Sequence, residues 1–264
     1  MTYRISLTGI DGAGKSTVRS DIANNLSKQY SVAQIGSSTS LIRDGKEEYL
    51  FQKTTGFLDM MRNAADRISF REGVLIVNGI NMQVQQSLEK KLIKEYSPDI
   101  SISGRDMTLC AAVYITYYVP SSRSISTELR LRIFNSLRRM GYPDQLFYMD
   151  VEPKTADLRI RERMEGESAG FAPEKAKFRQ MHENPENLSE LRKYYLEGVA
   201  ILERHGVNVV RIPTTGRPHS EVTSEIQAKI EDRLSPPSKA SNIPLRGANI
   251  YGTGSQFDGK NLTC

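Results

Sequence analysis

The sequence contains little cysteine and little histidine, which argues against several classes of site. Among its 264 residues there are two cysteines, Cys110 and Cys264, and they form no C-x-x-C pair. A disulfide framework or a structural zinc site would need more cysteines or a Cys/His cluster. The three histidines, His182, His205 and His219, are scattered along the chain, so we expect them to be surface residues.

Long apolar segments are also missing. No apolar run approaches the roughly 18 residues of a membrane-spanning helix, and the first residues, from Met1 to Arg4, show no signal peptide. We therefore expect a cytoplasmic enzyme without a membrane partner. The composition, 38% hydrophobic and 25% charged, fits a globular protein. A net charge of +5 suits an enzyme that handles phosphates, but it does not indicate nucleic-acid binding.

Short apolar segments alternate with amphipathic ones along most of the chain. We predict strands at residues 3–8, 31–35, 99–103, 145–151 and 207–212. We predict helices at residues 16–30, 57–70, 73–96, 126–140, 156–164, 188–205 and 221–234. This alternation favours right-handed βαβ units around a five-stranded parallel sheet, which is a three-layer α/β/α fold.

The composition changes at Ser235. Prolines, glycines, serines and asparagines follow without periodicity. We expect residues 1–234 to form one domain and residues 235–264 to be a disordered or surface-draped tail. A partner-binding role for this tail is the alternative.

A phosphate-binding loop follows the first predicted strand. The segment Gly9–Thr17 reads GIDGAGKST and matches the pattern G-x-x-x-x-G-K-[ST]. Its glycines allow backbone N–H groups to converge on phosphate oxygens, and the next helix directs its positive end at the same anion. Lys15 would reach the β- and γ-phosphates, and the Ser16 hydroxyl would bind Mg²⁺. The pattern therefore predicts the P-loop NTPase fold with ATP and Mg²⁺ as cofactors. The predicted contacts are Gly9, Gly12, Ala13, Gly14, Lys15, Ser16 and Thr17.

Other segments favour a kinase over the remaining P-loop classes. There is no N-K-x-D motif, which a GTPase would carry. The strand ending at Asp150 superficially resembles the Mg²⁺-binding strand of a motor ATPase, but it leads into Glu152-Pro153, and we interpret Asp150 as an ordinary strand end. Arg159 and Arg163 lie one helical turn apart before a Gly/Ser-containing stretch, which is typical of a lid over ATP, at about residues 159–172. Such arginines stabilise the charge on a transferring phosphoryl group. The alternative is a solvated charged helix.

Five segments, in order, resemble the thymidylate kinase family of nucleoside monophosphate kinases. They are the P-loop, Ala64-Ala65-Asp66-Arg67, Ser103-Gly104-Arg105-Asp106, Pro143–Val151 and Tyr194-Tyr195-Leu196. The resemblance extends from Tyr3 to Leu234. It implies transfer of the γ-phosphate of ATP to a nucleotide, above all dTMP, and the homodimer that is usual in that family.

The resemblance also implies roles for acceptor-side residues. Asp11 corresponds to the carboxylate near the acceptor sugar and the transferring phosphate, and Arg105 to the arginine that clamps the acceptor phosphate. Arg67 corresponds to the residue that contacts the base. Cys110 falls where the family has a small polar residue near the thymine. Arg43 is the candidate to replace the arginine that the family carries after its second strand.

Departures from the family pattern lie on the acceptor side. Gly104 stands where the family has an aspartate, so a carboxylate is missing unless Asp106 or Asp11 compensates.

Three hypotheses about the function follow. The acceptor is a nucleoside monophosphate, or it is a nucleoside, sugar or other hydroxyl compound, which would need Asp11 or Asp106 as a base. In the third, the chain is a nucleotide-dependent regulatory protein that acts through its tail.

Overall fold

A computed structural model describes residues 1–36, 39–57, 60, 71–138, 140–167 and 184–234. Its centre is a seven-stranded sheet in the order β4-β3-β2-β5-β1-β6-β7. The strands are β1 (Tyr3–Thr8), β2 (Val32–Ile35), β3 (Thr39–Arg43), β4 (Lys46–Leu50), β5 (Ile100–Ser103), β6 (Gln145–Asp150) and β7 (Val209–Pro213). The run β2-β5-β1-β6-β7 is parallel throughout. These are the five predicted strands, and the α/β class is confirmed.

The predicted sheet lacked two strands. Strands β3 and β4 form an antiparallel hairpin that extends the sheet beyond β2. The hairpin turns at Asp44 and Gly45, both with positive φ (50° and 70°), which is the signature of an Asp-Gly hairpin turn. Thr39 and Ser40, which resemble loop residues in the sequence, are buried in β3.

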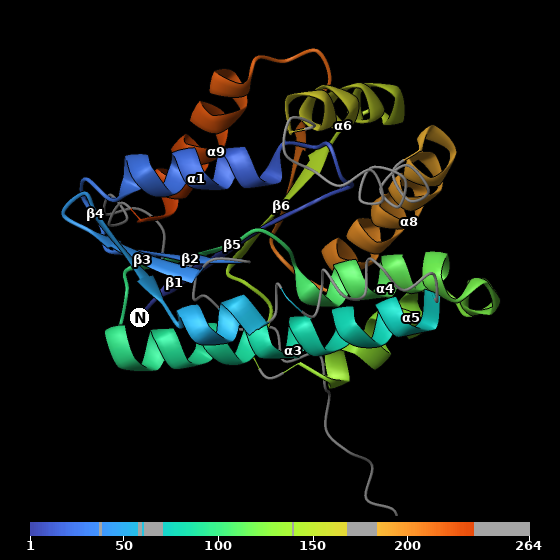
Figure 1. Ribbon diagram of the computed structural model, residues 1–264, viewed down its shortest axis with the longest axis horizontal. Helices are drawn as coiled ribbons and strands as arrows, with labels where there is room; N and C mark the ends of the chain where they lie inside the picture. Colours follow the sequence, from blue (N-terminus) through green and yellow to red (C-terminus); the bar gives the residue numbers. More distant parts are fainter. Residues whose placement is uncertain (37–38, 58–59, 61–70, 139, 168–183, 235–264) are drawn as a thin grey trace, which may run out of the picture.

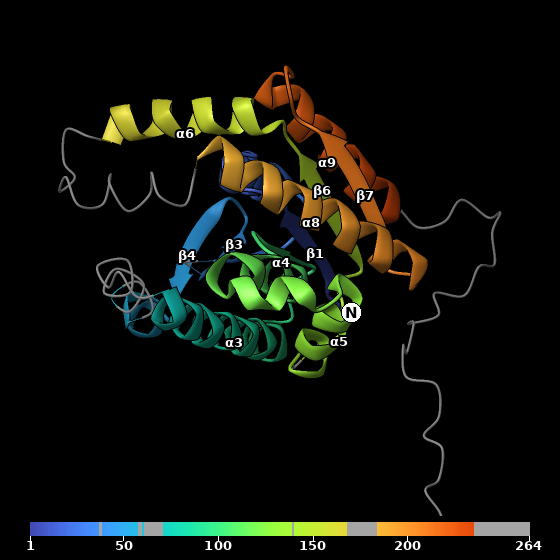
Figure 2. The same cartoon turned by 90° about the vertical axis from the view of Figure 1, so that its right-hand side faces the viewer.

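Helices cover both faces of the sheet, as the three-layer prediction requires (Figure 1). They are α1 (Lys15–Leu26), α3 (Arg71–Tyr96), α4 (Met107–Tyr118), α5 (Thr127–Ser136), α6 (Pro153–Glu167), α8 (Pro185–Arg204) and α9 (His219–Leu234), with a 3₁₀ turn at Pro120–Ser124. Helices α1 and α9 pack together on one face, and α3, α4 and α8 lie on the other. Helix α6 runs alongside α8 (Figure 2). Of the described helices, none is long and apolar enough to span a bilayer.

Helix α4 was not predicted, and its surroundings explain why. It is buried on nearly every side, so its sequence, MTLCAAVYITYY, is apolar all round and lacks the polar face that marks an amphipathic helix. It packs against α8, where Leu109 and Tyr195 are both completely buried. This buried pair of helices supports one side of the site described next.

The parallel strands determine where that site lies. The P-loop follows the end of β1, Gly104 and Arg105 follow the end of β5, and Gly36 follows the end of β2. Because β2, β5 and β1 are parallel neighbours, these three ends share one edge of the sheet. Ligands of open α/β sheets bind outside this carboxyl edge.

Candidate phosphotransferase site

The P-loop forms a cradle that fits an anion. Gly9, Gly12 and Gly14 have φ values of 145°, 80° and 86°, which side chains rarely adopt. A Cβ at Gly9 would lie 2.5 Å from the Met149 carbonyl oxygen, so the loop packs directly on β6. The N-cap of α1 is Gly14, and no side chain of the described residues caps the helix there. The amino end of a helix attracts anions, so this end suits a phosphate.

Lys15 spans the inside of this loop. Its Nζ donates hydrogen bonds to the carbonyl oxygens of Gly9 (2.9 Å) and Ile10 (2.7 Å) and lies 3.7 Å from Asp11 Oδ1. Ser16 and Thr17 are exposed on the first turn of α1, and Ala13 is buried beneath the loop. The glycine cradle, the uncapped helix and the lysine together suit a nucleoside triphosphate. The exposed Ser16 hydroxyl is an oxygen ligand of the kind that Mg²⁺ prefers.

Asp11 is the centre of the charged groups beside the P-loop. Its Oδ1 lies 3.7 Å from Arg105 Nη2 as well as 3.7 Å from Lys15 Nζ. Its Oδ2 accepts a hydrogen bond from the Tyr114 hydroxyl at 2.7 Å. The structure thus brings together Asp11, Lys15 and Arg105, which the sequence placed in three separate roles. Both oxygens of the carboxylate face donors, so its direction is fixed.

Tyr114 was missed by the sequence reasoning. Asp106, Cys110 and Tyr114 follow one another at intervals of four residues, which places them on one side of a helix. This spacing was the signal in the sequence that could have identified Tyr114. Burial raises the pKa of its phenol well above the usual value, and the charge of Asp11 raises it further. Tyr114 therefore remains a hydrogen-bond donor to Asp11 at neutral pH.

Cys110 lies under this group but is buried. The side chain is 3% exposed, with Sγ 3.1 Å from the Tyr195 hydroxyl and 3.6 Å from Thr8 Oγ1. Burial raises the pKa of the thiol. Cys110 thus lies between α4, α8 and the end of β1, and its contact with an acceptor base stays a prediction.

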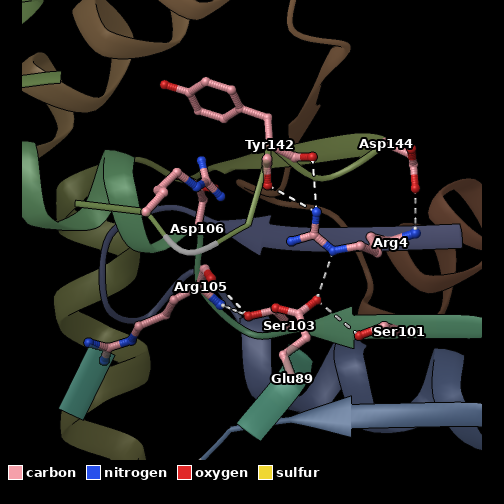
Figure 3. Close-up of polar contacts among 10 residues, drawn as sticks. Arg4, Glu89, Ser101, Ser103, Arg105, Asp106, Tyr142 and Asp144 are labelled. Carbon is pink, nitrogen blue, oxygen red and sulfur yellow. Dashed lines mark hydrogen bonds and ion pairs between the residues drawn. The ribbon is translucent and has the colours of Figure 1, made fainter. Parts of the chain in front are cut away.

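Arg105 is presented by a fixed turn between β5 and α4. The Ser103 hydroxyl donates to the Arg105 carbonyl oxygen at 2.8 Å, and the Arg105 side chain points away from the network that Arg4, Glu89 and Ser101 form (Figure 3). In that network, Glu89 accepts from Arg4 and Ser101, each at 3.2 Å. The Arg105 side chain is half-exposed.

Asp106 cannot serve as the missing acceptor-side carboxylate, and this part of the second hypothesis is corrected. It is the N-cap of α4: its Oδ1 accepts from the Leu109 backbone N–H at 2.8 Å. Its Oδ2 is paired with Arg138 at 2.9 Å, and both side chains are more than nine-tenths buried. Both oxygens are engaged beneath the surface, so the residue stabilises the fold.

One of the α6 arginines, Arg159, contacts the P-loop. Arg159 donates to the carbonyl oxygens of Thr214 (2.9 Å) and Gly12 (3.4 Å), so it joins α6 to the back of the P-loop. Arg163 lies one turn further along, with an exposed side chain. Arg161 points elsewhere and pairs with Asp157. The rest of the expected lid, residues 168–172, falls outside the described residues.

One predicted acceptor contact, Arg43, is not joined to this group. Arg43 ends β3, which runs antiparallel to β2, so it lies at the amino edge of the parallel strands and bonds to the Tyr96 carbonyl oxygen. The expectation that it replaces the family's acceptor arginine is therefore corrected: strand β3 carries it away from the P-loop. Arg67 lies outside the described residues, as does the tail.

Asp150 agrees with its interpretation as a strand end. Its two oxygens accept hydrogen bonds from Arg192 Nε (2.7 Å) and Nη2 (2.9 Å). This bidentate pair ties β6 to α8 and engages the carboxylate that superficially resembles the Mg²⁺ ligand of a motor ATPase.

Comparison with known proteins extends the structural evidence. No protein-family model matches the chain. Curated proteins give no significant match either. Among solved structures, the chain is similar to deoxyadenosine kinase from M. mycoides, determined with the products dCMP and dCDP bound. The TM-score is 0.52 at 16% sequence identity, over 87% of this chain and 99% of that one. The chain has the fold of a P-loop kinase.

That likeness concerns the fold. The P-loop kinase fold agrees with the sequence prediction, while at 16% identity the neighbour does not distinguish the thymidylate kinase family from nucleoside kinases.

Proposed function

We propose that this protein is an ATP-dependent kinase whose acceptor is a nucleotide, most simply a nucleoside monophosphate such as dTMP. One observation carries the choice of acceptor. Both acceptor-side carboxylates are engaged: Asp106 by Leu109 and Arg138, and Asp11 by Lys15, Arg105 and Tyr114. An alcohol needs a base to remove its proton, whereas a phosphate is already anionic at neutral pH.

The roles of the residues follow from their positions. The P-loop glycines and Lys15 would hold the triphosphate of ATP, and Ser16 would hold Mg²⁺, which when bound neutralises charge on the phosphates. Arg105 would hold the acceptor phosphate in line for attack. Asp11, which lies 3.7 Å from both Lys15 and Arg105, would hold these two cations in position between the donor and the acceptor. Arg159 and Arg163 would stabilise charge from the α6 side.

The phosphoryl transfer forms one bond and breaks one. An oxygen of the acceptor phosphate forms a bond to the γ-phosphorus, the bond from that phosphorus to the β–γ bridging oxygen breaks, and ADP leaves. The positioned cations supply electrostatic stabilisation, which is the main requirement of phosphoryl transfer.

The test is ADP release, measured with ATP and Mg²⁺ across nucleoside monophosphates and the corresponding nucleosides. Stimulation by monophosphates and not by nucleosides supports the proposal. Stimulation by nucleosides alone would favour the second candidate, a hydroxyl acceptor, with Asp11 as the base. ATP binding without any stimulated turnover would favour a regulatory protein.

Asp11→Asn separates the first two candidates. Under the monophosphate proposal, Asp11 orients its neighbours, and the variant should lose turnover modestly, by about tenfold. Loss of a base would cost about 10²- to 10⁴-fold at unchanged acceptor affinity.

A further inference from the structure

Two glycines at the carboxyl edge of the sheet make room for an arginine of α1. Gly36 follows β2, and a Cβ there would lie 2.2 Å from Arg19 Nη1. Gly104 follows β5, and a Cβ there would lie 3.0 Å from the same atom. Neither glycine has a positive φ, so the backbone does not require glycine at either place. At both places the Arg19 guanidinium lies where a side chain would stand: a Cβ at Gly36 would displace it, and a Cβ at Gly104 would be in tight contact with it.

Arg19 is poorly paired in this position. Nη1 donates to the Ile35 carbonyl oxygen at 2.9 Å, but Nε is buried and has no hydrogen-bond partner among the described residues. Arg19 also forms no salt bridge with any of the described residues. Burial lowers the pKa of Arg19, and the negative charge of Glu47 opposes this shift. A partly buried guanidinium without a paired anion is unfavourable, so a bound anion would stabilise it.

Glu47 does not supply that anion. Its carboxylate accepts hydrogen bonds from Ser40 (2.6 Å) and Tyr49 (3.1 Å) on the β3–β4 hairpin. It therefore influences Arg19 only through its charge.

The position of Arg19 points to the acceptor. Gly104, which Arg19 contacts, immediately precedes Arg105, and Gly36 ends the neighbouring strand β2. Arg19 and Arg105 thus approach the same carboxyl edge, one from α1 and one from the β5–α4 turn. The Arg19 guanidinium, a cation, thus lies next to the position that a side chain at residue 104 would take.

We propose that Arg19 is an acceptor-binding residue that, with Arg105, binds the phosphate group of the nucleotide acceptor. This inference rests on the proposed function and makes it specific. Two guanidinium groups present several donors to the oxygens of one phosphate, which an uncharged hydroxyl acceptor could not satisfy. The arginine that was expected at Arg43 is supplied from α1 instead.

The test is calorimetric binding to protein saturated with ADP and Mg²⁺, so that the P-loop is already filled. The probes are dTMP, thymidine and inorganic phosphate. In Arg19→Gln we expect about 10- to 100-fold weaker binding of dTMP and inorganic phosphate, with ADP affinity and thymidine binding unchanged. The matched control is Arg132→Gln, which removes the same charge from an exposed pair with Glu128 on α5 and should change nothing.

Gly36→Ala is the second variant, in case Arg19→Gln does not fold. It displaces only the flexible end of Arg19, so the fold should survive while phosphate binding weakens in the same direction. Unchanged binding of dTMP and inorganic phosphate in a folded variant would overturn the role of Arg19. A fall in thymidine affinity by the same factor would overturn it too.

The two proposals fail in different ways. If the wild-type protein binds inorganic phosphate through Arg19 but neither binds nor phosphorylates any monophosphate, the anion site stands and the nucleotide acceptor is wrong. If monophosphates are phosphorylated equally well without Arg19, the function stands and the Arg19 assignment is wrong. If the ADP-loaded wild-type protein binds none of the probes, both are wrong.

Discussion

The Tyr114 hydroxyl donates a hydrogen bond of 2.7 Å to Asp11 Oδ2, across 103 positions of sequence. This contact links α4, which continues from the turn that carries Arg105, to the P-loop, which would hold ATP. Tyr114 also packs edge-on against Tyr195 of α8, with ring centroids 6.3 Å apart. The direction of Asp11 thus depends on the buried α4–α8 pair.

Tyr114→Phe removes this contact and keeps the ring. We expect turnover to fall by about tenfold, because a hydrogen bond to a charged group is lost, while KM for ATP stays the same. Steady-state kinetics of the variant provide the measurement. Tyr30→Phe, a partly buried tyrosine outside the site, is the matched control. A rise in KM for ATP with no change in turnover would show that Tyr114 does not act through Asp11.

Asp106 should matter for stability and not for chemistry. Asp106→Ala removes an N-cap and leaves Arg138 buried without its anion, and we expect a loss of about 3–5 kcal/mol in the free energy of unfolding. Urea denaturation measures this loss. Asp106→Asn keeps an oxygen at the cap and should be less destabilised, and its folded fraction should turn over at nearly the wild-type rate. Loss of turnover in well-folded Asp106→Asn would restore Asp106 as a candidate base.

The buried thiol of Cys110 should be unreactive. Burial raises its pKa, and the side chain is 3% exposed, so little thiolate is available to an alkylating reagent. In Cys264→Ser, which leaves Cys110 as the single cysteine of the chain, we expect labelling only as the protein unfolds. Mass spectrometry after iodoacetamide treatment with and without urea tests this. Rapid labelling of the native variant would contradict the buried position.

Alkaline pH should destabilise the fold through its tyrosines. Burial, with a smaller contribution from Asp144, raises the pKa of Tyr3 to about 12 against the opposing charge of Arg233. The unfolded chain releases this proton near the ordinary value of 10.0 while the native state keeps it, so the stabilisation is complete below that pH and is lost as pH rises toward 12. Urea denaturation at about pH 8 and about pH 11 should show the fall, and Tyr3→Phe should reduce it. An equally steep fall in Tyr3→Phe would mean that Tyr3 does not contribute.

The sequence predicted the parts of the fold that have a local signature. Five buried strands and an amphipathic α8 follow from periodicity, and the P-loop follows from its glycines and Lys15. Helix α4 and strand β3 were missed for opposite reasons: α4 is apolar on every side, and β3 carries buried Thr39 and Ser40 that look like loop residues. Both cases reflect tertiary burial, which a local pattern does not record.

The candidate site was predicted unevenly for a related reason. Asp11, Lys15 and Arg105 could be named from motif position. Arg19 and Tyr114 could not, because their importance comes from contacts with strand ends and loops far away in sequence. Arg43 was misplaced because the β3–β4 hairpin, which carries it to the opposite edge, was not predicted.

The most direct test of the account is transfer of ³²P from γ-labelled ATP to a panel of nucleoside monophosphates and nucleosides, with products separated by chromatography. Lys15→Met, which removes the P-loop cation, is the control for transfer at this site. We expect a labelled nucleoside diphosphate with the wild-type protein and none with Lys15→Met. Labelling of nucleosides alone, or of no acceptor while ATP still binds, would contradict it.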